Sequence, residues 1–134
     1  MNSLKGHIKE VQVNGSLSLV TVALSDETLF KAVIIETPET ASYLIEGHLV
    51  NVLFKETEVV IGKDKTHLIS LQNQIKGEIK HIERGLLLSN VIINTPVGDI
   101  SSIITTNAVD QLSLKEELRV CAMIKTNEIM LSEE

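Results

Sequence analysis

The stretch "NQIKG" at residues 73–77 repeats the pattern of "NSLKG" at residues 2–6, and this repeat decides how the chain is organised. Asparagine, lysine and glycine hold the same places in both stretches, and Leu4 is matched by Ile75. The separation is 73 − 2 = 71 residues in a chain of 134 residues. Self-similarity at a fixed spacing indicates an internal duplication.

The similarity continues beyond these five residues. The offset is 71 in the first part of each copy and becomes 125 − 55 = 70 after one residue is gained or lost near the turn "TPVGD". We therefore predict a first unit at 1–63, a linker at 64–72 that runs into the next strand, and a second unit at 73–134. The identical pairs include Lys5/Lys76, Gly6/Gly77, Ile8/Ile79, Val20/Val91, Ile34/Ile104, Glu46/Glu116, Val50/Val120, Lys55/Lys125 and Glu58/Glu128.

Strand signals dominate both units. Segments rich in β-branched residues, some of them alternating with polar ones, are separated by turn-like stretches, which is the pattern of short strands. Each unit is predicted to run β-β-β-α-β-β, and the whole chain to be an all-β protein of two tandem five-stranded OB-like barrels. The predicted strands are 7–13, 18–24, 30–37, 48–54 and 58–62, then 77–83, 86–94, 99–106, 118–125 and 128–132.

One short helix is expected in each unit, between its third and fourth strands. In "TPETASYLIEG", Thr37 can cap a helix, Pro38 fits its first position and Gly47 fits the residue after its end. In "NAVDQLSL" of the second unit, Asn107 is the expected cap. The linker segment "HLISLQ" alternates, so we expect it to feed the first strand of the second unit.

Composition excludes several classes of function. Hydrophobic residues make up 43% of the chain, yet no apolar run approaches the roughly 20 residues that a membrane helix needs. The start "MNSLKGHIKE" lacks the apolar run and cleavage site of a signal peptide. The single cysteine, Cys121, rules out an internal disulfide and fits a reducing compartment. We expect a soluble cytoplasmic protein with no membrane partner.

Charge and size bear on the partners. A net charge of −6 and an aromatic content of 2% argue against nucleic acid, which requires basic surfaces and stacking side chains. A unit of about 60 residues is only marginally stable by itself, because it buries too small a fraction of its surface. Packing of unit on unit and of chain on chain is therefore expected, and we predict a homo-oligomer.

No catalytic constellation is visible. The four histidines (His7, His48, His67 and His81) lack a metal-ligand spacing, and one cysteine cannot build a cysteine-rich zinc site. Cys121 lies in an alternating strand, where a small core residue is the simpler interpretation. We predict a protein that is not an enzyme, has no cofactor and offers no direct ligands to a metal ion.

Two lysines stand at equivalent strand ends, Lys55 in "KETEVVI" and Lys125 in "KTNEIML". A solvated charge is the simpler interpretation for either one. The functional interpretation is a cation that binds a small oxyanion together with hydroxyl and amide donors, because oxyanion oxygens only accept hydrogen bonds. Nearby donors are Ser70, Gln72 and Asn73 before the second unit, and Thr105 and Thr106 before its helix.

The stretch "SLQNQIKGEIKHIERG", with "ISSIITTNAVDQLSLKEELRVCAMIKTNEIML", resembles the molybdate-binding Mop (molbindin, TOBE) family. The family pattern reads roughly S-x-R-N-x-[LI]-x-G, then I-T-x-x-[SA], then L-K-[AS]. The resemblance covers the whole chain in two copies and is stronger in the second copy. The arrangement of the two copies is similar to that of the tandem di-Mop proteins. The resemblance implies that the oxyanion sites lie between subunits. It also implies a trimer, in which three chains of two units each take the place of six single units.

The family's ligands carry over unevenly. In the second unit the motif arginine falls on Gln72 and a motif serine falls on Ala108, so one charge and one hydroxyl are missing. In the first unit Ile35, Pro38 and Glu56 replace hydroxyl positions. The residues that the resemblance implies at the oxyanion are Ser70, Gln72, Asn73, Thr105, Lys125 and Thr126, with Asn2, Ser3 and Lys55 as secondary candidates.

The resemblance implies cytoplasmic binding, storage or delivery of molybdate or tungstate. The losses at Gln72 and Ala108 support a different hypothesis, in which the oxyanion sites have degenerated. The chain would then be a structural or interaction module of molybdenum transport or cofactor synthesis. An enzyme is the third hypothesis, and no residue pattern supports it.

Overall fold

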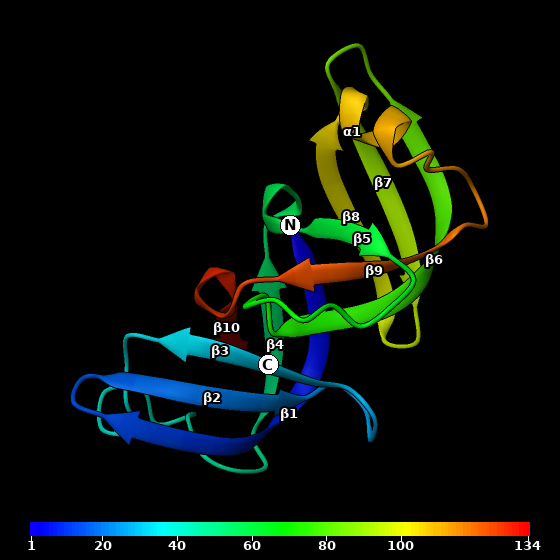
Figure 1. Cartoon of the computed structure of the whole chain (residues 1–134). Coiled ribbons are helices and arrows are strands. Elements are labelled where there is room, and N and C mark those ends of the chain that lie inside the picture. The colour runs from blue at the N-terminus through cyan, green and yellow to red at the C-terminus, as the bar shows by residue number, and fades with distance from the viewer.

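The computed structural model describes residues 1–134 as two curled, five-stranded antiparallel sheets, which confirms the predicted all-β, OB-like fold (Figure 1). The strand order is β10-β4-β1-β2-β3 in the first sheet and β5-β9-β6-β7-β8 in the second. No helix of the structure is long and apolar enough to span a bilayer. The elements are β1 (Asn2–Asn14), β2 (Leu17–Ala23), β3 (Leu29–Ile34), β4 (Leu49–Phe54), the 3-10 turn η1 (Glu56–Glu58), β5 (Val60–Lys63), β6 (Asn73–Arg84), β7 (Leu88–Thr95), β8 (Gly98–Thr105), α1 (Thr106–Gln111), β9 (Arg119–Ile124), the 3-10 turn η2 (Thr126–Glu128) and β10 (Met130–Glu133).

The last strand of each repeat lies in the sheet of the other repeat. β10 pairs with β4, with Met130 opposite Leu53, and β5 pairs with β9, with Val60 opposite Met123. The turns η1 and η2 redirect the chain between the sheets, η1 packing against β8 and η2 against β3. Each sheet therefore takes strands from both repeats, so the predicted ranges 1–63, 64–72 and 73–134 describe repeats of the sequence and do not correspond to separate sheets.

A reciprocal pair of asparagines joins the two sheets. The side chain of Asn73 in β6 accepts the backbone N–H of Lys31 in β3 at 2.7 Å and donates to its carbonyl oxygen at 2.8 Å. Asn2 in β1 makes the same two bonds to Ser101 in β8, both at 2.8 Å. Since β3 and β8 are edge strands, each amide occupies backbone groups that an edge leaves unpaired.

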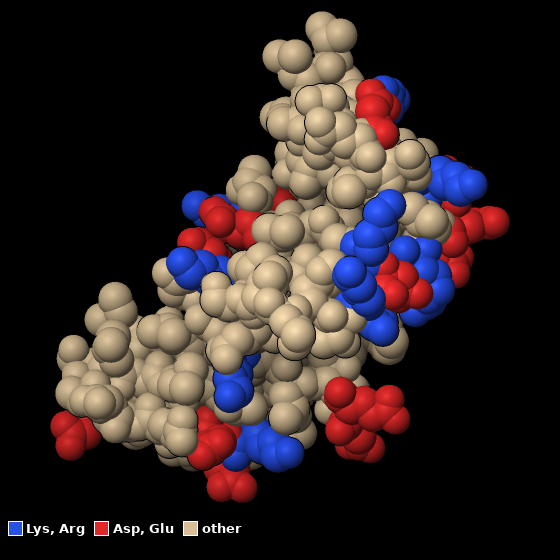
Figure 2. All heavy atoms as spheres, in the orientation of Figure 1, with Lys and Arg blue, Asp and Glu red and all other residues tan.

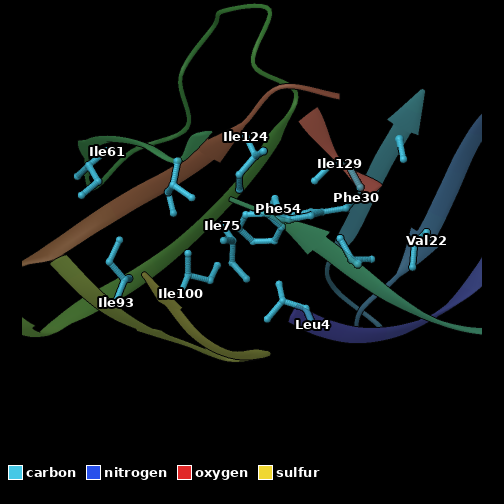
Figure 3. Packing of buried hydrophobic residues seen from close by; sticks show 14 of the residues in the cluster. Leu4, Val22, Phe30, Phe54, Ile61, Ile75, Ile93, Ile100, Ile124 and Ile129 are labelled. Carbon is cyan, nitrogen blue, oxygen red and sulfur yellow. The ribbon is translucent and has the colours of Figure 1, made fainter. Parts of the chain in front are cut away.

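The hydrophobic core is continuous across both sheets. One cluster of 24 buried residues includes side chains from every strand except β10, whose Leu131 packs against it while partly buried. Figure 3 shows Phe54 between Ile75 on one side and Phe30 and Ile129 on the other, so a first-repeat side chain fills the junction. A shared core removes the stability problem of a unit of about 60 residues.

The glycine of the repeated motif is required by close packing. A Cβ atom at Gly77 would lie 2.5 Å from the carbonyl oxygen of Asn94, and one at Gly6 would lie 2.7 Å from that of Ala23. Both contacts are to backbone atoms, which cannot swing away. A register shift follows in each strand, between Ile8 and Glu10 and between Ile79 and His81. Each first strand is therefore irregular at the same place.

The helix predicted in the first unit is wrong. Residues 37–47 form successive turns, in which the Thr37 carbonyl accepts from the N–H groups of Thr40 and Ala41 at 3.0 and 2.8 Å. Only Ala41 and Leu44 of this segment are buried, and the Thr37 and Thr40 hydroxyls bond to backbone groups of residues 37 and 39, which competes with helical hydrogen bonds. Gly47 does adopt the positive φ expected of it, at 90°, and ends the turns.

The second helix forms, but its cap is Thr105 and the prediction of Asn107 is wrong. Thr105 is the last residue of β8 and extended, so the chain enters α1 directly from the strand. Its hydroxyl accepts the N–H of Ala108 at 3.0 Å. The expected extension of β6 back through 67–72 is also absent, because the linker is irregular up to Gln72 and β6 begins at Asn73.

Because the core is shared, Phe54→Ala is expected to destabilise both sheets together. The cavity left by a buried phenylalanine costs about 3–5 kcal/mol of unfolding free energy. Urea denaturation followed by circular dichroism should show one transition moved to lower urea. Leu17→Ala, at a position 43% exposed, is the matched control and should move it little. Two resolved transitions would contradict a shared core.

Candidate oxyanion-binding site

Lys125 and Lys55 occupy equivalent places in the fold. Each follows a buried central strand, β9 or β4, and its carbonyl oxygen accepts the N–H of the glutamate three residues later at 3.0 Å, which opens a 3-10 turn. Both side chains are exposed. None of the seven ion pairs of the structure involves either lysine. The two ammonium groups are therefore free to meet an anion.

The second unit places amide donors beside Lys125. Asn73 pairs with Ile124 in the ladder between β6 and β9, so Gln72 and Lys125 are the next residues at the same end of the two strands. Gln72 is exposed, whereas Asn73 is 1% exposed and its side chain is hydrogen-bonded to the backbone of Lys31. Thr126, partly buried, follows as the first residue of η2.

A polar hollow of about 470 Å³ lies between β3 and the linker, next to this strand end. It brings together the predicted residues Gln72 and Asn73 with Lys31 and His67, which the sequence did not single out. No local signal could have found Lys31, because β3 belongs to the other repeat. The lining residues are Leu29, Lys31, Thr66, His67, Ile69, Gln72, Asn73 and Gln74.

Other features of the chain offer less to an oxyanion. A hollow of the same volume at the hairpin of β1 and β2 is lined by polar, uncharged and apolar residues and has no cation. Cys121 offers no nucleophile, because burial raises the pKa of its thiol and keeps it protonated. No cluster of His, Cys, Asp or Glu could hold a metal ion. The chemistry available beside Lys125 is that of hydrogen-bond donation.

Thr105 lies far from Lys125 within one chain. Asn73 of β6 lies beside the end of β9, whereas Arg84 of β6 pairs with Ser89, which pairs with Ile104, the neighbour of Thr105. These two ends of β6 are 84 − 73 = 11 residues apart, about 35 Å along the strand. In Figure 1, α1 and the end of β9 likewise lie in different parts of the molecule. One chain does not bring these two predicted ligands together.

The first unit presents a different surface at its lysine. Glu56 follows Lys55 where Thr126 follows Lys125, and its carboxylate accepts from the Met1 ammonium at 2.7 Å. That hydrogen bond holds the pKa of Glu56 below its ordinary value, so the group is a carboxylate at neutral pH. The Asn2 side chain is already hydrogen-bonded to the backbone of Ser101, and Ser3 is exposed in β1. Glu56 and the Met1 ammonium form a pair with no net charge, so Lys55 lacks the neighbouring hydroxyl that Thr126 gives Lys125.

Comparison with known proteins adds a family to this geometry. A family model described as the TOBE domain matches residues 69–131. Molybdenum-pterin-binding protein 3 of Clostridium pasteurianum is 33% identical over 64 residues, which are 47% of this chain and 94% of that protein. The chain belongs to the Mop/TOBE family. Its strongest signal lies in the second repeat, as the residue motifs predicted.

Two longer Mop/TOBE relatives match both repeats. The molybdenum transport protein ModE of Azotobacter vinelandii is 24% identical over 132 residues, which are 98% of this chain and 49% of that protein. The crystal structure of the cytoplasmic molybdate-binding protein ModG with molybdate bound matches with a TM-score of 0.92 and 25% identity. That match covers 99% of this chain and 96% of the ModG chain, so the tandem arrangement is common to both.

Asn73→Ala should loosen the junction of the sheets. The change leaves the N–H and carbonyl of Lys31 without their partners, at an expected cost of about 1–3 kcal/mol in unfolding free energy. Chemical denaturation measures the loss, and Asn2→Ala should show a similar one at the reciprocal bond pair. Gln12→Ala, at an exposed site in β1, is the control. Equal stability of all variants would argue against the asparagine bonds.

Proposed function

We propose that this chain binds molybdate or tungstate in the cytoplasm, without turnover, and stores or delivers the anion. The observation that carries the proposal is the free Lys125 ammonium beside Gln72 at the end of β9, in a chain whose fold matches molybdate-bound ModG along its whole length. ModG is a cytoplasmic protein, which supports the same location here. No cofactor is needed for this function.

The donor set suits a tetrahedral dianion. Lys125 supplies charge, Gln72 an amide N–H, and Ser70 and Thr126 hydroxyl groups, all of which can donate to oxygens that only accept. Because sulfate has the same charge and shape as molybdate, discrimination would depend on cavity size and on the number of matched donors. Lys31 adds a second positive side chain at the neighbouring hollow.

A site that uses both Lys125 and Thr105 requires two chains. The surface near Thr105 supports an assembly, because the tip of the β6–β7 hairpin exposes Leu86, Leu87 and Leu88 at 93%, 76% and 57%. The Leu87 carbonyl accepts the N–H of Thr106, so this tip is tied to the start of α1. Figure 2 shows mostly uncharged surface there. We propose a homo-oligomer, a trimer by family resemblance, with sites between subunits.

The alternative is a structural or interaction module whose oxyanion sites have degenerated. Gln72 lacks the charge of the family's arginine, and Ala108 lacks a hydroxyl. The ion pair at Glu56, where the second unit has Thr126, further supports the loss of one of the two equivalent sites. On this alternative the chain would dock onto a protein of molybdenum transport or cofactor synthesis and would not respond to the anion.

Lys125→Met separates the two proposals. Loss of a charge-assisted hydrogen bond of about 1.5–3 kcal/mol should weaken molybdate binding roughly 10- to 150-fold, with the oligomer unchanged. Equilibrium dialysis measures the affinity, and light scattering measures the mass. Lys55→Met is the matched control at the equivalent strand end and should change the affinity little. Unchanged affinity in Lys125→Met would contradict the site.

Thermal unfolding with different anions tests selectivity. A ligand that binds only the folded state stabilises it by RT ln(1 + [L]/Kd), about 4 kcal/mol at a thousandfold excess over Kd. Molybdate or tungstate should raise the melting temperature at matched ionic strength, and sulfate and phosphate should raise it much less. Equal small shifts with all four anions would favour the structural module.

A further inference from the structure

The Gln74 side chain directs its amide hydrogen bonds to the backbone of the linker. Its Oε1 accepts the N–H of His67 at 3.0 Å, and its Nε2 donates to the carbonyl oxygens of His67 at 2.9 Å and Leu71 at 2.8 Å. A primary amide has two N–H donors, so Nε2 is fully used. One nitrogen thereby joins both ends of the loop 67–71.

The linker has little other support. Residues 64–72 contain no strand or helix, and Leu68 and Ile69 are 99% and 51% exposed. The His67 ring provides a second anchor, with Nε2 3.1 Å from the Lys63 carbonyl oxygen and the ring edge against Gly62, and Asp64 pairs with Arg119 at 3.6 Å. Ordering a loop costs about 1–2 kcal/mol per residue in backbone entropy, so these few bonds decide whether it has one conformation.

The loop carries two of the proposed ligands. Ser70 lies inside the loop whose ends Gln74 joins. Gln72 lies between two residues with fixed positions, since Leu71 accepts a hydrogen bond from Gln74 and Asn73 donates one to Lys31. The side chains of Ser70 and Gln72 are both exposed and make no hydrogen bond within the chain that would orient them otherwise. Their positions therefore depend on the backbone to which they belong.

We propose that Gln74 is a positioning residue for the oxyanion site, pinning the loop 67–71 so that Ser70 and Gln72 face the anion held by Lys125. This inference rests on the proposed function and deepens it. Gln74 acts through the backbone of the loop, to which its amide is bonded. It lowers the entropy lost on binding by holding the donors in place beforehand. The counterpart in the first repeat is Ser3, which has no amide to close such a loop.

A double-mutant cycle on molybdate affinity tests the proposal. Ser70→Ala should weaken binding about tenfold, the loss expected for one hydrogen bond to an anion. Gln74→Met should weaken it at least as much, because it releases both Ser70 and Gln72. The double variant should bind within about twofold of Gln74→Met, because Ser70 contributes nothing once its loop is released. A role of Gln74 in stability alone predicts losses that multiply, and that result would overturn the proposal.

Hydrogen exchange of the same variants gives an independent measurement. Gln74→Met should speed exchange of the His67 amide at least about tenfold, because that N–H loses its acceptor, Gln74 Oε1, and should leave the core strands protected. Gln12→Met, at an exposed strand site, is the matched control. Unchanged exchange in the linker would overturn the proposal. If Gln74→Met fails to fold, Gln74→Glu serves, since a carboxylate still accepts from His67 but cannot donate.

The wild-type titration separates the two levels of inference. A wild-type chain that binds no molybdate would overturn the proposed function and the role of Gln74 together. A wild-type chain that binds, with Ser70 and Gln74 losses that multiply, would overturn only the role of Gln74.

Discussion

The reciprocal bonds of Asn2 and Asn73 are the constraint on which the rest of the structure depends. Each asparagine opens the first strand of its repeat and uses its amide as if it were one more backbone unit on the edge strand of the other sheet. The bonds leave the edge strands β3 and β8 less exposed to pairing with foreign strands. The strands are exchanged in the same reciprocal way, because β10 joins the first sheet and β5 joins the second. The hydrophobic core is likewise built by both sheets.

This arrangement explains why a polar hollow forms where it does. The hollow is lined by Lys31 of the first repeat and by Gln72 and Asn73, where the linker meets β6, and the strand end that holds Lys125 lies next to it. Asn73 fixes the distance between these parts because it is bonded to Lys31 and stands next to Gln72. The hollow is therefore a product of the junction and would not exist in one repeat by itself.

The two repeats share a scaffold but differ in their chemistry. Gly6 and Gly77 meet carbonyl oxygens in the same way, and both lysines open the same turn. Beside Lys55, however, stands the ion pair of Glu56, and beside Lys125 stands the hydroxyl of Thr126. Steric requirements of the backbone keep the scaffold residues alike, whereas an exposed position next to a lysine can change without loss of the fold.

The sequence alone determined the duplication, the ten strands to within a few residues, and the lysines at the strand ends, because alternation and turn residues are local properties that the chain carries in order. It also marked Ser70 and Gln72 through the family motif, while whether they bind the anion stays a prediction. The turns at Thr37 and the bonds of the Gln74 amide are local, with partners at most seven residues away, yet no residue pattern singled them out. Only the tertiary structure decided that β5 and β10 exchange sheets and that Lys31 lies beside the motif residues. Both depend on contacts between segments far apart in the chain, and a four-residue strand carries no local pattern that names its partner.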